Sequence, residues 1–204
     1  MTYETPEQKM LTVREVAVKL YEAKQRFTYA DYLTWPNEER WELLNGLPFE
    51  MAAPTRKHQK IIGILHAAFF NYLKDKACEV YLAPFDVRLS DEDEEIDTVV
   101  QPDLSVFCDL TKLDNLGAKG APDLIIEILS PSTSGYDKVV KMEIYRKHGV
   151  KEYWIIEPRM ETIQVYILDE NKHYRTRGYQ AGEKIKVHIL KDLEIDVKEV
   201  FQNE

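Results

Sequence analysis

Apolar residues recur at helical spacing in two stretches of the first part of the chain. Between Leu11 and Lys24 they return every three or four positions, which predicts an amphipathic helix that packs either on its own domain or on a second copy of the chain. From Thr55, a typical N-cap residue, to about Lys76 a longer helix is expected. One face of this helix is apolar and should be buried; it consists of Ile61, Ile62, Leu65, Phe69, Tyr72 and Leu73.

Short apolar runs predict strands over much of the remaining chain. The Asn45–Gly46 pair separates two such runs and favours a hairpin. Pro48 confines the second hairpin strand to a sheet edge, because proline has no N–H to donate. A helix that opens at Ser134 and Asp137 and ends at Gly149 interrupts the strands. The other strands are predicted at residues 80–89, 99–108, 123–129, 153–156, 162–168, 174–179 and 184–190.

The order of these elements predicts an α/β protein in which helices flank a mixed β-sheet, with a strand-rich C-terminal part. A chain of 204 residues suits one domain. We place this domain at residues 28–204 and expect residues 1–27 to form an N-terminal helical extension. If the extension packs on a second copy, the protein is a homodimer.

Charge and composition narrow the function classes. The chain carries 27 Lys and Arg against 36 Asp and Glu, a net charge of −9, whereas proteins that wrap duplex DNA nonspecifically are more often basic. Any role on DNA must therefore use a local positive surface or a bound metal ion. The longest apolar run, residues 61–70, is shorter than the roughly 20 residues that span a bilayer. We expect a cytoplasmic protein without membrane association, in which Cys78 and Cys108 are reduced core residues.

Two acidic residues stand in strands that should be buried. In the strand predicted at 99–108, Asp103 shares a face with Gln101 and Ser105. Glu127 lies within the run Leu-Ile-Ile-Glu-Ile-Leu, where a carboxylate is costly unless it is paired or bound to a metal ion. If the two strands are neighbours, Asp103 and Glu127 come together. A pair of carboxylates suits Mg²⁺, which prefers oxygen ligands.

A lysine on the following helix is a candidate for the same site. Asp137, Lys141, Tyr145 and His148 fall on one helical stripe. If the helix packs over the strand that carries Glu127, the Lys141 ammonium can orient a metal-bound water or stabilise a phosphate. The alternative is a surface ion pair between Asp137 and Lys141, worth about 0.3–0.5 kcal/mol.

Several motifs carry a resemblance to a known family. They are Val99–Val106 (VVQPDLSV), Ala121–Thr133 (APDLIIEILSPST), Gly149–Pro158 (GVKEYWIIEP) and Trp41–Gly46 (WELLNG). Over about residues 28–168 the chain resembles the Uma-type endonuclease family, formerly a domain of unknown function, within the PD-(D/E)XK nuclease superfamily. The resemblance implies a restriction-endonuclease-like core in which Mg²⁺, with Mn²⁺ as a substitute, activates water to hydrolyse DNA phosphodiester bonds.

The resemblance also assigns roles to residues. It implies metal ligands at Asp103, Glu127 and the backbone carbonyl of Ile128. Leu129 stands where the superfamily has its catalytic lysine, and Lys141 would supply the amine from the helix instead. Glu42, in the early hairpin, matches an accessory acidic position that binds metal or water.

Other residues and functions remain as alternatives. Asp123 also follows a proline and either caps a loop or takes part in catalysis. His58 either contacts phosphate or is a plain surface histidine, and Tyr145 and Trp154 are expected in the core rather than on bases. The chain is either a nuclease or a nonenzymatic binding module that keeps the nuclease fold. A glycosidase that uses Asp103 and Glu127 is a weaker hypothesis, which a chelator would test.

Overall fold

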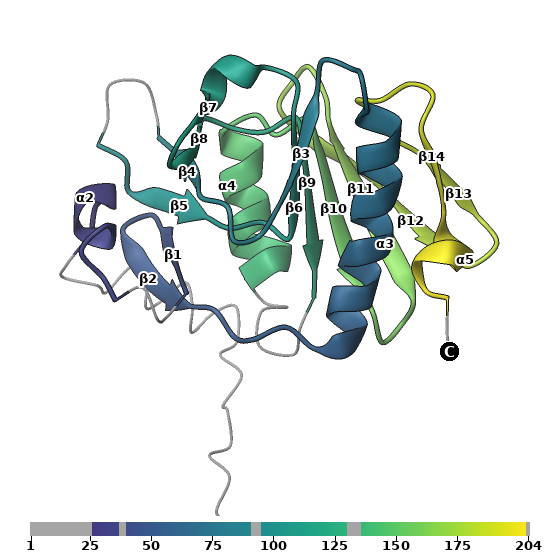
Figure 1. Cartoon of the computed structure of the whole chain (residues 1–204), viewed down its shortest axis with the longest axis horizontal. Coiled ribbons are helices and arrows are strands. Elements are labelled where there is room, and N and C mark those ends of the chain that lie inside the picture. The colour runs from purple at the N-terminus through teal and green to yellow at the C-terminus, as the bar shows by residue number, and fades with distance from the viewer. Residues whose placement is uncertain (1–25, 37–39, 91–94, 130–135, 203–204) are drawn as a thin grey trace, which may run out of the picture.

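The computed structural model describes residues 26–36, 40–90, 95–129 and 136–202 (Figure 1). The helix predicted at residues 11–24 lies outside these ranges, as does Ser134. In the described part of the chain the helices are α2 (Tyr29–Tyr32), α3 (Arg56–Leu73), α4 (Met142–Lys147) and α5 (Val197–Val200). A 3₁₀ turn spans Leu110–Lys112, and a π-helical segment, Tyr136–Lys141, leads directly into α4. None of these helices is long and apolar enough to cross a membrane.

Within the described ranges the strands form two six-stranded sheets and a small third one. The first sheet has the order β2-β1-β5-β4-β8-β7 and contains β1 (Trp41–Leu44), β2 (Leu47–Glu50), β4 (Val87–Leu89), β5 (Thr98–Val100), β7 (Leu113–Asp114) and β8 (Gly117–Lys119). The second, called the central sheet below, has the order β12-β11-β10-β9-β6-β3. It contains β3 (Glu79–Leu82), β6 (Leu104–Phe107), β9 (Leu124–Ile128), β10 (Glu152–Glu157), β11 (Thr162–Leu168) and β12 (Tyr174–Gln180). The third pairs β13 (Lys184–Lys186) with β14 (Glu194–Asp196).

Both large sheets are mixed. Strands β9 and β10 run parallel in the central sheet, and β4 and β8 run parallel in the first sheet. The other neighbours in these sheets are antiparallel. The protein is therefore a mixed α/β structure, as predicted, although two large sheets replace the single one expected.

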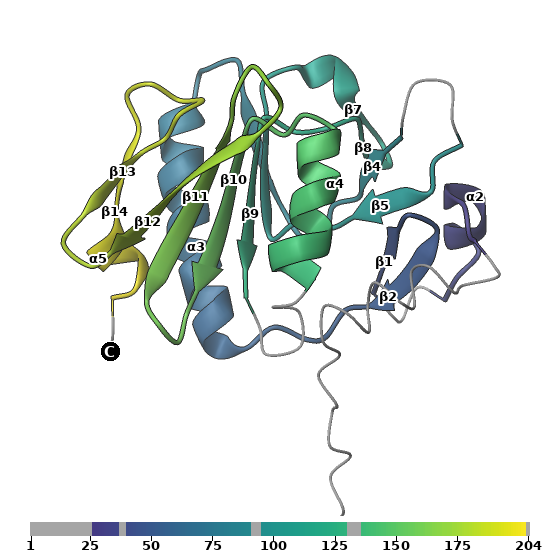
Figure 2. The ribbon, with the colours of Figure 1, turned by 180° about the vertical axis from the view of Figure 1, so that it is seen from behind.

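The central sheet is covered on both faces. Helix α3 lies against one face and α4 against the other, which Figures 1 and 2 show from opposite sides. On the α3 side, Leu124, Ile126 and Ile128 of β9 join a core that also includes the C-terminal strands. On the α4 side, Ile125 packs with residues of the helix and of the first sheet. Burial on both faces explains why β9 is apolar almost throughout.

The predicted helix and hairpin are confirmed. Helix α3 begins after Thr55, whose hydroxyl accepts a hydrogen bond from the His58 N–H, and its predicted apolar face is largely buried. The hairpin joins β1 and β2 through Asn45–Gly46, and β2, which contains Pro48, is an edge strand. The helix that carries Lys141 ends before Gly149, which has a positive φ of 80°. Such a backbone conformation suits glycine at the end of a helix.

Two predicted strands are wrong in the same way. The segments at 80–89 and 99–108 each form two short strands that belong to different sheets. The chain crosses between the sheets at residues 83–86 and 101–103, and each crossing contains a proline, Pro84 or Pro102. Proline has no N–H to donate to a neighbouring strand, so strand pairing is interrupted at each crossing. The alternation of apolar residues in the sequence continues through the crossing and does not reveal it. Gln101, Asp103 and Ser105 consequently do not share the face of one continuous strand.

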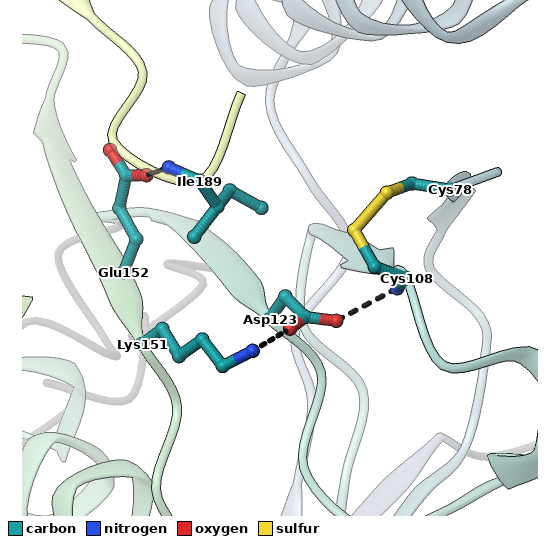
Figure 3. The surroundings of a disulfide bond; sticks show 6 residues. All are labelled: Cys78, Cys108, Asp123, Lys151, Glu152 and Ile189. Carbon is teal, nitrogen blue, oxygen red and sulfur yellow. Dashed lines mark hydrogen bonds and ion pairs between the residues drawn. A yellow bond between two sulfur atoms is a disulfide. The ribbon is translucent and has the colours of Figure 1, made fainter. Parts of the chain in front are cut away.

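The cysteines are paired, contrary to the prediction of reduced thiols. Cys78 and Cys108 form a disulfide bond (Figure 3). Strands β3 and β6 are antiparallel with Glu79 opposite Phe107, so the next position on each strand brings the two cysteines together. Thirty positions separate them along the chain, and only the strand register reveals that they are neighbours.

Candidate active site

The pairing of strands β6 and β9 relates the positions of two of the candidate acids. The strands are antiparallel, and Leu104 lies opposite Ile126. Continuing that register by one residue places Asp103 opposite Glu127. The backbone positions of these two acids are therefore adjacent, with Asp103 in the crossing segment just before β6 rather than within a long strand. Their side chains have different partners, described below.

Glu127 lies in a buried group of charges. Its Oε1 accepts hydrogen bonds from Lys141 Nζ at 2.9 Å and from the Tyr145 hydroxyl at 2.7 Å. Lys141 Nζ also donates to Glu42 Oε1 at 2.8 Å. The side chains of Glu42, Glu127 and Lys141 are each only 5–6% exposed. We call Glu42, Glu127, Lys141 and Tyr145 the buried cluster.

This arrangement excludes one of the two interpretations of Lys141. A surface pair with Asp137 requires an exposed ammonium, whereas Lys141 is buried between two carboxylates. The Asp137 side chain itself lies outside the described structure. In a site of low polarity each buried charge needs a partner of opposite charge. Lys141 is such a partner for both Glu42 and Glu127.

Glu42 reaches the cluster from the other sheet. It lies on β1, and its Oε1 also accepts a hydrogen bond of 2.8 Å from the backbone N–H of Gln101. The Gln101 side chain is held in turn, since its Oε1 accepts from Arg40 and its Nε2 donates to Asp86 and to the Tyr32 hydroxyl. The segment between β5 and β6 thus ties Glu42 to the end of β6, and the cluster lies where the two large sheets meet.

Asp103 has a separate set of partners. Its Oδ2 accepts a hydrogen bond from the backbone N–H of Ile128 at 2.7 Å and lies within hydrogen-bond distance of His58 Nε2, at 3.0 Å. His58 lies in the first turn of α3 with a side chain 13% exposed, so its interpretation as a plain surface histidine is wrong. Sequence analysis missed this contact because His58 and Asp103 are 45 positions apart in the chain. The one available signal was the place of His58 at the start of a helix expected to pack on the sheet.

Asp123 lies at the opposite end of β9 from Glu127. Its Oδ2 accepts a hydrogen bond from the backbone N–H of Cys108 at 2.8 Å, and its Oδ1 pairs with Lys151 Nζ at 2.7 Å (Figure 3). These contacts hold the start of β9 against the end of β6. Of the two interpretations of Asp123, the structure favours the structural one.

The two aromatic residues expected in the core are buried, but one has a polar contact as well. Trp154 is fully buried, and its Nε1 donates to Glu152 inside the protein. Tyr145 is also fully buried and packs edge-on against Tyr153, while its hydroxyl donates to Glu127. The hydroxyl was missed as a site group, although Tyr145 follows Lys141 by four positions, the spacing of neighbours on a helix.

Leu129 lies in an apolar environment. It is 5% exposed and belongs to the core beside α4, and its N–H donates to the Ile156 carbonyl. A lysine at this position would have to share that space. The amine that contacts Glu127 comes from Lys141 on the helical segment, the residue to which the family resemblance assigned it.

The oxygen donors at this end of β9 suit a hard cation. Among the described residues, no three His, Cys, Asp or Glu side chains form a ready ligand group. Mg²⁺ does not need one, because it is commonly held by one or two carboxylates and keeps several waters. Asp103 Oδ1 accepts no hydrogen bond from the described residues, and Glu127 lies opposite it. The donor set therefore fits Mg²⁺ through these two carboxylates and water.

Comparisons with known proteins agree with this architecture. Residues 29–198 match the model of the Uma2 family, described as "Putative restriction endonuclease". The uncharacterized protein slr1290 of Synechocystis sp. is 24% identical over 163 residues, which cover 78% of this chain and 84% of that protein. A crystal structure from Anabaena variabilis, described as a "putative nuclease belonging to DUF820", has 23% sequence identity and a TM-score of 0.71. That match covers 86% of this chain and 97% of the other, so the two proteins have the same fold.

Proposed function

Because the chain belongs to the Uma2 family, "Putative restriction endonuclease", we propose that it is a metal-dependent endonuclease that hydrolyses phosphodiester bonds in DNA. On this proposal, the central sheet with α3 and α4 is a restriction-endonuclease-like core. The observation that carries the proposal is the Lys141 ammonium, buried between Glu42 and Glu127 at 2.8 and 2.9 Å. Carboxylates can hold the metal ion in metal-assisted phosphate chemistry, and a lysine beside them can stabilise charge on the phosphate.

In this proposal, Asp103, Glu127 and the backbone carbonyl of Ile128 hold Mg²⁺. When bound, the ion supplies Lewis-acid stabilisation of the phosphate and lowers the pKa of a bound water. The preference for Mg²⁺ over a softer metal follows from the oxygen donors of the site.

The protein groups have complementary tasks. Lys141 orients the attacking water and stabilises negative charge that develops on the phosphate oxygens. Glu42 holds Lys141 in place, and the Gln101 N–H holds Glu42. Tyr145 fixes the Glu127 carboxylate from the helix side. Because these groups come from two sheets and one helix, their mutual positions are set by the packed core rather than by a flexible loop.

The proposal is tested by cleavage of supercoiled plasmid and of single-stranded DNA in Mg²⁺ or Mn²⁺, with EDTA as a control. The variants are Glu127→Gln and Lys141→Met, with Lys151→Met as the matched control because Lys151 pairs with the structural Asp123. We expect cleavage by the wild type and by Lys151→Met. Cleavage should fall by more than about 100-fold in Glu127→Gln and in Lys141→Met. This loss is larger than the roughly 10- to 100-fold effect of removing a group that only orients a metal ligand. Wild-type cleavage by Glu127→Gln, or cleavage that persists in EDTA, would contradict the proposal.

The apolar Leu129 and the net charge of −9 favour a second candidate function, a nonenzymatic module that binds nucleic acid or a protein partner. The same experiment separates the two candidates. A folded wild type that binds DNA without cutting it in either metal would support the binding module, whereas cleavage that depends on Glu127 would exclude it.

A further inference from the structure

We infer that His58 is a positioning residue that holds the Asp103 carboxylate in the orientation needed to bind the metal ion. The inference rests on the proposed function, because it takes Asp103 as a metal ligand. Three separate parts of the chain meet at this carboxylate: the first turn of α3, the crossing segment before β6 and the end of β9.

The two donors that reach Asp103 act on the same oxygen. Ile128 N–H donates to Oδ2 at 2.7 Å, and His58 Nε2 lies 3.0 Å from that atom. Because a metal-binding carboxylate only accepts hydrogen bonds, we assign the donor role in this contact to His58 Nε2. Two donors on Oδ2 fix the rotation of the carboxylate, while Oδ1 accepts no hydrogen bond from the described residues. The arrangement directs one oxygen to the protein and leaves the other for a ligand.

His58 is itself held by a rigid element. Its backbone N–H donates to the hydroxyl of Thr55, the N-cap of α3. Helix α3 is 18 residues long and packs along its length against the central sheet, with Leu65 and Phe69 fully buried. The imidazole therefore reaches Asp103 from a fixed backbone position, as a supporting group for a metal ligand requires.

The second nitrogen of His58 shows that packing alone does not explain the residue. Nδ1 is buried and has no hydrogen-bond partner among the described residues. Buried polar atoms are generally paired, and an unpaired one lowers stability. An apolar side chain in this place would avoid that penalty, so the contact between Nε2 and Asp103 is the property that distinguishes histidine here.

Substitutions that move the donor test this role. The amide nitrogen of glutamine lies as many bonds from Cα as Nε2 of histidine, whereas the amide nitrogen of asparagine corresponds to Nδ1. His58→Gln should therefore keep a donor on Asp103, while His58→Asn and His58→Leu should lose it. The matched control is His66→Leu, on the same helix, where the imidazole packs against Phe70.

The measurement is Mn²⁺ affinity by isothermal titration calorimetry, with Asp103→Asn as the reference for loss of a ligand and thermal unfolding in EDTA as a test of folding. We expect His58→Leu and His58→Asn to bind Mn²⁺ about 10- to 100-fold more weakly, the usual effect of removing a group that orients a metal ligand. His58→Gln and His66→Leu should stay near the wild type.

Two results would overturn the inference while the proposed function stands. The first is wild-type affinity in His58→Leu together with loss of binding in Asp103→Asn. The second is equal weakening in His58→Gln and His58→Leu, which would assign His58 to packing. If the folded wild type binds no Mn²⁺, the metal-dependent function fails, and the inference about His58 fails with it.

Discussion

The two ends of the β6–β9 strand pair carry the same local motif in different surroundings. At each end a Pro-Asp pair, residues 102–103 or 122–123, immediately precedes a strand. At one end Asp103 accepts the N–H of Ile128, and at the other Asp123 accepts the N–H of Cys108. Each aspartate thus binds the backbone near the end of the neighbouring strand, so the two contacts are related by the local twofold symmetry of an antiparallel pair.

The surroundings distinguish the two ends. Asp123 pairs with Lys151, whose side chain is 65% exposed, beside a disulfide bond that closes the same end of the sheet (Figure 3). At the other end the lysine is Lys141, which is 5% exposed and lies between the buried carboxylates of Glu42 and Glu127. The Pro-Asp motif by itself therefore marks a strand end. The candidate active site is marked by a buried lysine between two buried carboxylates. At the Asp123 end the buried carboxylates pair with an exposed lysine, in the case of Asp123, or with uncharged N–H donors, in the case of Glu152.

The largest difference between the ends is expected from removal of each lysine. Lys141→Met leaves two buried carboxylates without their cation and should lower the free energy of unfolding by about 3–5 kcal/mol. Lys151→Met removes a mostly exposed partner and should lower it by about 1 kcal/mol or less. Urea denaturation of both variants measures the difference. Equal losses of unfolding free energy in the two variants would show that the burial of Lys141 does not make its ion pairs stronger than that of Lys151.

The disulfide offers a second contrast, because it lies at the Asp123 end of the strand pair. Replacement of Cys78 and Cys108 by serine removes a bridge between positions 30 residues apart, which the loop-entropy relation values at about 3–4 kcal/mol. Denaturation with and without a reductant gives the loss. Mn²⁺ affinity should not change, since the cluster lies at the other end of β9, and a large loss of affinity would show that the two ends are coupled.

A smaller effect is expected from the Tyr145 hydroxyl. Tyr145→Phe keeps the ring that packs on Tyr153 and removes the donor to Glu127, which should lower the free energy of unfolding by about 1.5–3 kcal/mol. Tyr166→Phe is the matched control, because the Tyr166 ring stacks on the same Tyr153. Denaturation curves that coincide for the two variants would contradict a role for the hydroxyl in holding Glu127.

The smallest effect is a pH dependence at the Asp123 end. Burial raises the pKa of Glu152 above its ordinary value of 4.5, so the folded state binds this proton more tightly than the unfolded state. Stability should therefore decrease as the pH rises from 4.5 to the raised pKa, by at most about 1.4 kcal/mol per pH unit. Glu152→Gln should remove this component from the stability measured against pH. An unchanged pH profile would contradict the assignment.

The local parts of this architecture could be predicted from sequence. Helix α3 and the β1–β2 hairpin follow from a capping threonine, an apolar stripe and an Asn-Gly pair, all of which act over a few residues. The helix and the hairpin depend on neighbours in the chain, and the local pattern of residues records them. Family membership was predicted from the resemblance of longer motifs to a known family, such as the run around Asp103, and is confirmed.

The features that sequence analysis missed depend on distant contacts. The apolar pattern of residues 80–89 and 99–108 does not show where the chain passes from one sheet to the other. The pairing of Cys78 with Cys108 follows from the register of β3 and β6. The contact of His58 with Asp103 requires α3 to pack against the central sheet. Each is a consequence of tertiary packing that a single sequence does not encode as a local pattern.

The measurement that tests the account most directly is metal-dependent plasmid cleavage by Asp103→Asn and Asp123→Asn, purified in parallel with the wild type. The two substitutions make the same chemical change in the same motif at opposite ends of one strand pair. The account predicts that Asp103→Asn loses Mg²⁺-dependent cleavage, while Asp123→Asn cuts at close to the wild-type rate once its fold has been verified. Equal loss in both variants, or cleavage retained by Asp103→Asn, would contradict the assignment of the active site to the end of β9 that holds the buried cluster.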